Sequence, residues 1–101
     1  MRAISRKRLE EFWQKHADAE GQLKAWYRIA EKAEWKSFPD VRSVYGSADR
    51  VGDCYVFNVR GDSYRLIVRF LYDWSLVLIC AVLTHKEYDL DQWKETCRCN
   101  P

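Results

Sequence analysis

The chain lacks the features of several large protein classes. Its longest apolar run, residues 76–83, has the length of a β-strand and is far below the ~20 residues that a membrane-spanning helix needs. The opening residues 1–13 carry charges but no apolar segment of the kind found in secretory signals. We therefore expect a soluble, cytoplasmic protein that does not bind membranes.

Cysteine and histidine are too few and too scattered for a recognisable metal site. Cys54 and Cys80 fall within apolar, strand-like segments, where a free thiol packs as a small apolar side chain. Cys97 and Cys99 form a single C-x-C pair, with no second pair at the spacing of a zinc site. The chain also has no compact cluster of carboxylates. We predict structural or incidental thiols and no metal or cofactor, with a metal or redox role as the alternative.

A strong excess of one charge sign is missing as well. The formal net charge is +2, well below the profile of proteins that coat nucleic acid without sequence preference. The cations are unevenly placed: residues 1–36 hold nine Lys and Arg against six Asp and Glu, and residues 37–101 hold eight against nine. Any activity on nucleic acid must therefore depend on a local basic patch or on a larger complex.

The first half of the chain has helical periodicity. Apolar residues recur at helical spacing over about 5–16 and 19–35, and Ser5 is a suitable N-cap for the first helix. Pro39 suits the first turn of a short third helix, which Gly46 can close.

From about residue 54 the apolar period changes to two, which predicts β-strands. The predicted strands are residues 54–59, 64–72 and 76–83. No linker, repeat or low-complexity segment divides the chain. We predict a single α+β domain over residues 1–93, with two N-terminal helices and a short third helix packed on an antiparallel sheet, and a C-terminal tail over 94–101.

Two arginines share one face of the predicted strand 64–72. Arg65 and Arg69 alternate with apolar residues that suit the core, namely Tyr64, Leu66, Val68 and Phe70. The strand rise separates the two arginines by about 13–14 Å. A guanidinium group can bind a phosphate through two parallel hydrogen bonds, so this face is a candidate phosphate site.

Loop lengths predict which residues lie beside Arg65. With a two-residue hairpin loop at 61–62, Asn58 pairs with Arg65. If residues 73–74 close the next hairpin, Val82 pairs with Arg65 and the exit of the last strand lies close to the arginine. A one-residue error in either loop would reverse the face that these side chains occupy.

The exit of the last strand, residues 84–89, reads THKEYD. RNA cleavage requires a base for the 2′-hydroxyl proton, a cation for the phosphorane and an acid for the leaving oxygen. Histidine is the side chain that titrates nearest neutral pH, so His85 can serve as acid or base. Tyr88 can stack on a base or donate a proton, and either Glu87 or Asp89 can orient His85.

Plainer interpretations of the same residues stay open. A single histidine after a strand is often only an exposed polar residue, and strand arginines often cover apolar surface with their stems. We interpret His16 as structural, because its cation would complement the C-terminus of the first helix. The cluster Arg6-Lys7-Arg8 is interpreted as a solvated helix face that could also contact phosphate.

In their order and spacing, the motifs resemble the HigB family of toxins from type II toxin–antitoxin pairs, within the RelE/ParE-like superfamily. The segments that carry the resemblance are residues 1–9 (MRAISRKRL), 12–13 (FW), 23–27 (LKAWY), 35–37 (WKS), 39–41 (PDV), 56–58 (VFN), 64–69 (YRLIVR) and 84–89 (THKEYD). The resemblance spans about residues 1–93. Trp93 and the segment 97–99 (CRC) do not belong to the pattern.

The resemblance implies a RelE/ParE-like toxin fold and a metal-independent mRNA endoribonuclease (an mRNA interferase), in relatives often acting on the ribosome. It also implies a toxin–antitoxin hetero-oligomer with a HigA-like helix-turn-helix antitoxin. Carried onto this sequence, it implies catalytic roles for Arg65, Arg69, His85 and Tyr88. The residues that we expect to contact RNA are Asn58, Lys86 and Glu87.

Two other classes of function remain as alternatives. One is a ParE-like toxin that inhibits a protein target such as gyrase, and the other is an RNA- or protein-binding module without catalysis. His85 and Tyr88 favour the enzyme, because a toxin that only binds a protein has no need of a titrating residue. Lys86 is the only lysine near the predicted site, which leaves the general base unassigned.

Overall fold

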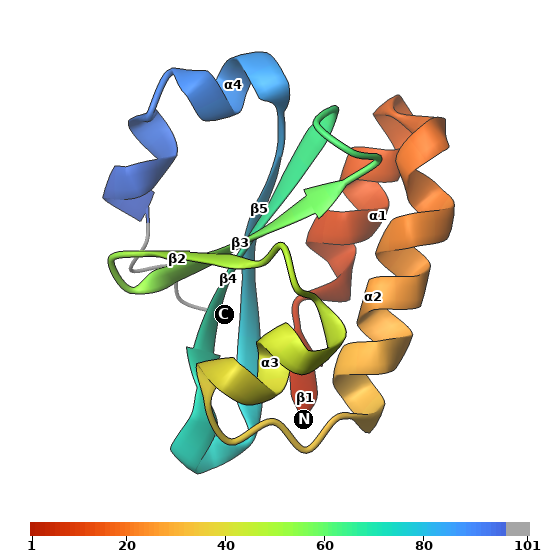
Figure 1. Cartoon of the computed structure of the whole chain (residues 1–101). Helices are drawn as coiled ribbons and strands as arrows, with labels where there is room; N and C mark the ends of the chain where they lie inside the picture. Colours follow the sequence, from red (N-terminus) through yellow and green to blue (C-terminus); the bar gives the residue numbers. More distant parts are fainter. Residues whose placement is uncertain (97–101) are drawn as a thin grey trace.

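The computed structural model describes residues 1–96 and contains a five-stranded mixed sheet with the strand order β1-β5-β4-β3-β2 (Figure 1). The strands are β1 (Arg2–Ile4), β2 (Asp49–Val51), β3 (Cys54–Val59), β4 (Tyr64–Leu71) and β5 (Leu76–Thr84). The α-helices are α1 (Arg6–Lys15), α2 (Glu20–Lys32), α3 (Phe38–Val44) and α4 (His85–Asp89). The 3-10 turns are η1 (Ala17–Ala19), η2 (Tyr72–Trp74) and η3 (Gln92–Thr96). The tail cysteines at 97 and 99 lie outside the described residues.

The predicted α+β class is confirmed, with helix bounds shorter than the periodicity indicated. α1 starts after Ser5, its N-cap residue, and ends at Lys15. α2 ends at Lys32 because the chain turns to extended backbone at Ala33, although apolar spacing continues to the buried Trp35. The tryptophan therefore packs from a loop and not from the helix.

The sheet was predicted to be purely antiparallel, but it is mixed. β1 pairs in parallel with β5, joining Arg2 to Leu76 and Ile4 to Leu78, whereas the other strand pairs are antiparallel. β1 and β2 have three residues each, too few to show a period of two. These short edge strands depend on pairing with their neighbours, so the sequence pattern did not reveal them.

One face of the sheet carries the main core. The apolar side of β4 packs against α1 and α2 as predicted, with Leu66 and Val68 fully buried. Aromatic rings fill much of the layer beneath the helices, including an edge-to-face contact between Trp26 and Phe57 at 5.5 Å. Figure 1 shows α1, α2 and α3 gathered on this side and α4 apart from them.

A β-bulge in β5 changes the predicted register. Close to the turn between β4 and β5, the pairing of the two strands follows the prediction, and Arg69 pairs with Leu78. Beyond the shift, Arg65 pairs with Leu83 and not with the predicted Val82. Cys80 is the extra residue, since Val68 pairs with Ile79 and Ile67 with Ala81. The error arises because a bulge adds one residue that loop counting cannot detect.

Arg8 reaches from α1 to the backbone of this bulge. Its Nη1 donates to the carbonyl oxygens of Ile79 and Cys80, at 3.1 and 2.8 Å. The interpretation of Arg6-Lys7-Arg8 as a solvated helix face is therefore wrong for Arg8, whose guanidinium joins a helix to the sheet.

We expect Arg8→Met to lower the free energy of unfolding by about 1.5–3 kcal/mol, because it removes hydrogen bonds from a charged donor to two partly buried carbonyls. Urea unfolding measures the change. Lys7→Met is the matched control: Lys7 is exposed, its contact to Glu11 is 3.8 Å long, and a change below ~0.5 kcal/mol is expected. Equal stabilities for the two variants would contradict a role for Arg8 at the bulge.

Candidate functional site

The site lies at the end of the sheet where β5 leaves it and α4 begins. Thr84 and Glu87 form a capping box: the Glu87 N–H donates to Thr84 Oγ1 at 3.3 Å, and the Thr84 N–H donates to Glu87 Oε1 at 2.9 Å. The His85 N–H also donates to the carbonyl of Ser63 in the β3–β4 turn, at 3.0 Å. The predicted strand exit is therefore a short helix that is tied to the neighbouring turn.

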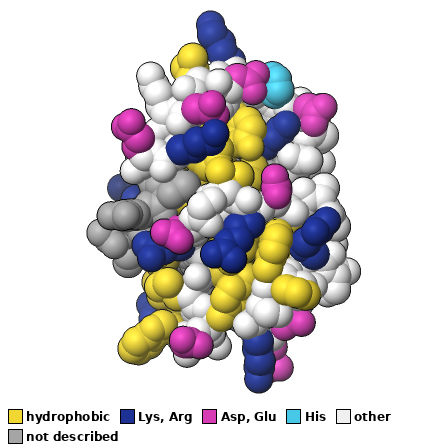
Figure 2. All heavy atoms as spheres, turned by 60° about the vertical axis from the view of Figure 1, so that its left-hand side comes forward, with side chains coloured by type: hydrophobic (Ala, Val, Ile, Leu, Met, Phe, Trp, Pro, Cys, Tyr) yellow, Lys and Arg dark blue, Asp and Glu magenta, His cyan; other side chains and the backbone are white. Residues whose placement is uncertain are grey.

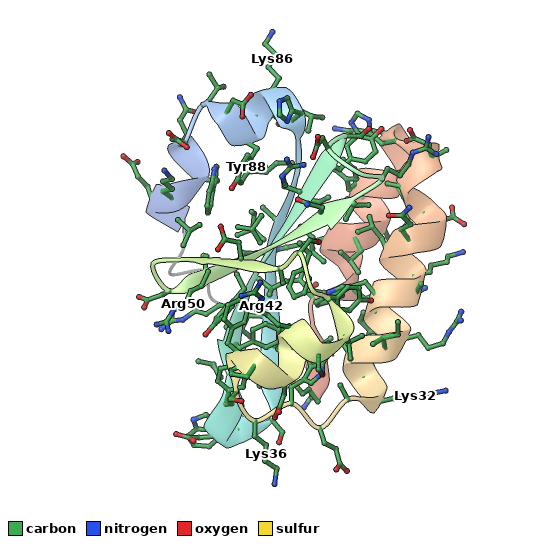
Figure 3. The ribbon with its side chains drawn as sticks, viewed as in Figure 1. Lys32, Lys36, Arg42, Arg50, Lys86 and Tyr88 are labelled. Atoms are coloured by element: carbon green, nitrogen blue, oxygen red, sulfur yellow. The ribbon has the colours of Figure 1, made fainter. Side chains whose placement is uncertain are left out.

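Arg65 and Tyr88 are in contact, which brings two of the predicted site residues together. The Arg65 guanidinium carbon lies 5.1 Å from the centroid of the Tyr88 ring, a cation–π distance. The side chain of Arg65 is only 11% exposed, and its Nη2 lies 3.5 Å from Asp62 Oδ1. Its Nη1 also donates to the carbonyl oxygen of Tyr64 at 3.2 Å, so Arg65 is held between a ring, a carboxylate and a backbone carbonyl. Figure 3 shows Tyr88 projecting from α4 toward the sheet.

His85 and Asp89 form the second element of the site. His85 Nε2 lies 3.1 Å from Asp89 Oδ2 within one turn of α4, and the imidazole is 56% exposed. Of the two carboxylates that we considered as partners for His85, Asp89 is the one that contacts it. Glu87 is engaged in the capping box instead. A carboxylate at this distance can restrict the orientation of the imidazole.

The other predicted residues take different positions. Asn58 is exposed and pairs with Arg65, as the loop count predicted. Arg69 is partly buried on the same side of β4 as Arg65, about 13 Å along the strand by its rise. Lys86 projects away from the body of the protein at the outer side of α4 (Figure 3). The structure therefore groups Arg65, Tyr88, His85 and Asn58 at one end of the sheet and leaves Arg69 apart.

The arginine face of the sheet also carries a small second core that the sequence did not reveal. Ile67, which lies between Arg65 and Arg69 in β4, is fully buried against Val56 and Trp93. Trp93 comes from η3, which follows α4 on this side of the sheet (Figure 1). Ile67 occupies the same face of the strand as the two arginines. An apolar residue at this position could have predicted that the face is partly covered.

The thiols of this core were wrongly predicted to be free. Cys54 and Cys80 are both disulfide-bonded. Cys54 is fully buried in the second core, and Cys80 packs against it from the bulge of β5. Spacing along the chain did not reveal this, because a disulfide requires two sulfur atoms to meet in the folded protein. The C-x-C pair lies outside the described residues.

His16 has a structural place, in line with its interpretation from the sequence. Its ring stacks on Phe12 at 4.5 Å and lies 5.3 Å from the Tyr64 ring. The Tyr64 hydroxyl donates to Asp18 at 2.7 Å, and this hydrogen bond raises the pKa of the phenol. The cluster fastens the end of α1 to the first residue of β4.

Neither a metal centre nor a membrane helix is found in the part of the chain that the structure describes. Residues 1–96 contain no group of three or more His, Cys, Asp or Glu side chains placed to hold an ion. No helix within these residues is long and apolar enough to cross a bilayer.

Together, these contacts offer the parts needed to bind a phosphate and move a proton beside it. Arg65 provides a fixed cation, and His85 and Tyr88 provide groups that can exchange protons. Figure 2, turned so that the side opposite α2 comes forward, shows basic and acidic side chains interspersed with apolar ones across this face. The face as a whole is therefore of mixed charge, and phosphate binding would depend on individual cations such as Arg65.

The comparisons with known proteins agree with this chemistry. Residues 19–91 match the family model described as HigB_toxin, the RelE-like toxic component of a toxin–antitoxin system. The chain is 29% identical over 92 residues to the mRNA interferase toxin HigB of Escherichia coli K12, with 88% of each chain covered. An mRNA interferase HigB of Shigella flexneri matches with the same identity and coverage.

Proposed function

The chain belongs to the HigB family of RelE-like toxins, and from this premise we propose that it is the toxin of a type II toxin–antitoxin pair and cleaves mRNA as an endoribonuclease. The contact of Arg65 with Tyr88, beside the His85–Asp89 pair, carries the proposal. The names of the relatives, which are mRNA interferases, support the same reaction. A ParE-like action on gyrase has no comparable support.

Cleavage begins when the 2′-oxygen of the RNA attacks the adjacent phosphorus and the bond to the 5′-oxygen breaks. One group takes the proton of the 2′-hydroxyl, and another protonates the leaving 5′-oxygen, so that a cyclic phosphate and a free 5′-hydroxyl result. Arg65 binds the non-bridging oxygens and stabilises their charge as the phosphorane forms. His85 and Tyr88 are the two proton-transferring groups.

Asp89 would orient His85 toward the RNA. Its Oδ2 lies 3.1 Å from Nε2, so this nitrogen faces the carboxylate and Nδ1 is left for the substrate. Glu87 supports the site through the capping box that starts α4. Asp89 and Glu87 would therefore both help to position His85.

The remaining predicted residues would extend the contact with RNA. Arg69 lies far enough along β4 to bind a phosphate other than the scissile one. Asn58, opposite Arg65, can hydrogen-bond a base or a sugar near the cleaved bond. Lys86 is exposed and adds attraction for the backbone without fixing its position.

We also propose the partners and the compartment. A HigA-like helix-turn-helix antitoxin would neutralise the toxin in a hetero-oligomer, and the ribosome would present the mRNA in the cytoplasm. The net charge of only +2 supports a ribosome-assisted reaction, because the chain alone has little general affinity for RNA.

Brief expression of the chain in bacteria tests this function. Growth should stop, cellular mRNA should decline while plasmid supercoiling stays normal, and co-expression of the cognate antitoxin should restore growth. A change in supercoiling with intact mRNA would favour the gyrase alternative. Normal growth with abundant soluble protein would contradict the toxin function altogether.

A further inference from the structure

Trp93 lies outside the residues that match the family, which end at 91, yet it makes close contacts with the site. Its ring stacks on Tyr88 with centroids 5.0 Å apart and an interplanar angle of 14°. Its Nε1–H donates to the carbonyl oxygen of Tyr88 at 3.0 Å. Because Arg65 lies on the same tyrosine ring, the guanidinium and the two rings form a continuous chain of contacts.

The chain is shaped locally to bring Trp93 back to Tyr88. Asp91 has a left-handed backbone, with φ of 60°, and its N–H donates to the Tyr88 carbonyl at 3.2 Å. That carbonyl therefore receives two donors, which closes α4 and turns η3 toward the sheet. Lys94 forms an ion pair with Asp91, with Nζ 3.2 Å from Oδ1, which closes this turn.

The other side of Trp93 is anchored in the sheet. The residue is only 4% exposed and packs in the second core with Cys54, Val56 and Ile67. Tyr88 is only partly buried, so the rigid indole supports a ring that would otherwise be free to turn. A close-packed neighbour restricts the rotation of a side chain, and a restricted ring in turn restricts the arginine on it.

We propose that Trp93 is a positioning residue of the ribonuclease site: it holds Tyr88, and through Tyr88 the guanidinium of Arg65, in the orientation that binds the scissile phosphate. This inference rests on the proposed function of Arg65 and Tyr88. Trp93 touches no substrate in this account, and its effect is on geometry. Catalysis is sensitive to such geometry, and a displacement of about 1 Å can lower a rate by about 100-fold.

Trp93→Leu and Trp93→Phe separate positioning from packing. Leucine fills part of the buried volume but has no flat ring, whereas phenylalanine keeps a flat ring for Tyr88 and loses the Nε1–H donor and part of the indole volume. Val68→Ala is the stability control, because Val68 is fully buried on the helix side of the sheet and away from Trp93. Each protein is assayed with ribosomes and a defined mRNA, at a temperature where all variants are folded.

We expect Trp93→Leu to lower the single-turnover cleavage rate by about 10–100-fold with little change in KM, and Trp93→Phe and Val68→Ala to stay near the wild-type rate. The ¹⁵N relaxation of the Arg65 Nε–Hε group should show greater motion in Trp93→Leu only. A wild-type rate in Trp93→Leu, with Arg65→Ala inactive, would overturn this inference alone. No cleavage by the wild-type protein would overturn the proposed function and this inference with it.

Discussion

Arg65→Ala is expected to abolish toxicity and to lower mRNA cleavage by about 10²–10³-fold, the usual cost of removing a donor that stabilises developing negative charge. The protein should stay folded, because Arg65 belongs to the face of β4 away from the helices, and its partners are the exposed Asp62, the Tyr88 ring and the carbonyl of the neighbouring Tyr64. Cleavage rates measured beside melting temperatures decide the matter. Arg69→Ala should cause a smaller loss of cleavage, since Arg69 lies further from His85.

Leu66→Ala is the matched control for Arg65→Ala. Leu66 is the next residue in β4 and is fully buried on the helix side. Its truncation should cost about 2–5 kcal/mol through a cavity, while the folded fraction keeps its cleavage rate. If Arg65→Ala unfolds, or cleaves as fast as the wild type, the assignment of Arg65 to phosphate binding is wrong.

His85→Ala is expected to lower cleavage by about 10²–10⁴-fold, the range for loss of a general acid or base. The imidazole is 56% exposed and its ion pair with Asp89 is on the surface, so little stability should be lost. Single-turnover rates measure the effect. Asp89→Asn should cause a smaller loss of rate, because it leaves the imidazole in place.

Lys86→Ala is the control for His85→Ala. Lys86 neighbours His85 but projects away from the site, so its truncation should weaken RNA binding slightly and leave the rate at saturation unchanged (Figure 3). Unchanged cleavage by folded His85→Ala protein would remove His85 from the mechanism. Tyr88 and a group from the RNA or the ribosome would then have to move both protons.

The sequence predicted the faces of β4 and its pairing with β3 correctly, because both follow from apolar periodicity and from the length of a short turn. The alternation in β4 placed Leu66 on the core side and Arg65 on the other, and strand geometry allows no other arrangement when one set is apolar. The short β3–β4 turn predicted the pairing of Asn58 with Arg65. Both inferences depend on residues near each other in the chain.

Features that depend on distant contacts were missed. The bulge at Cys80 is stabilised by Arg8 from α1, a partner 72 positions away in the sequence. The burial of Trp93 depends on the path of η3 after α4, which no local pattern shows. α4 is a different case, because Thr84 and Glu87 have the spacing of a capping box and could have predicted a helix start.

Primer extension on cellular mRNA after brief induction tests the central claim most directly, because it maps each new 5′ end to a nucleotide. The wild-type chain should produce discrete new 5′ ends within translated messages, and the Arg65→Ala and His85→Ala variants, expressed to the same level, should produce none. Growth arrest without new 5′ ends, or the same ends with both variants, would contradict RNA cleavage by the site at Arg65 and His85.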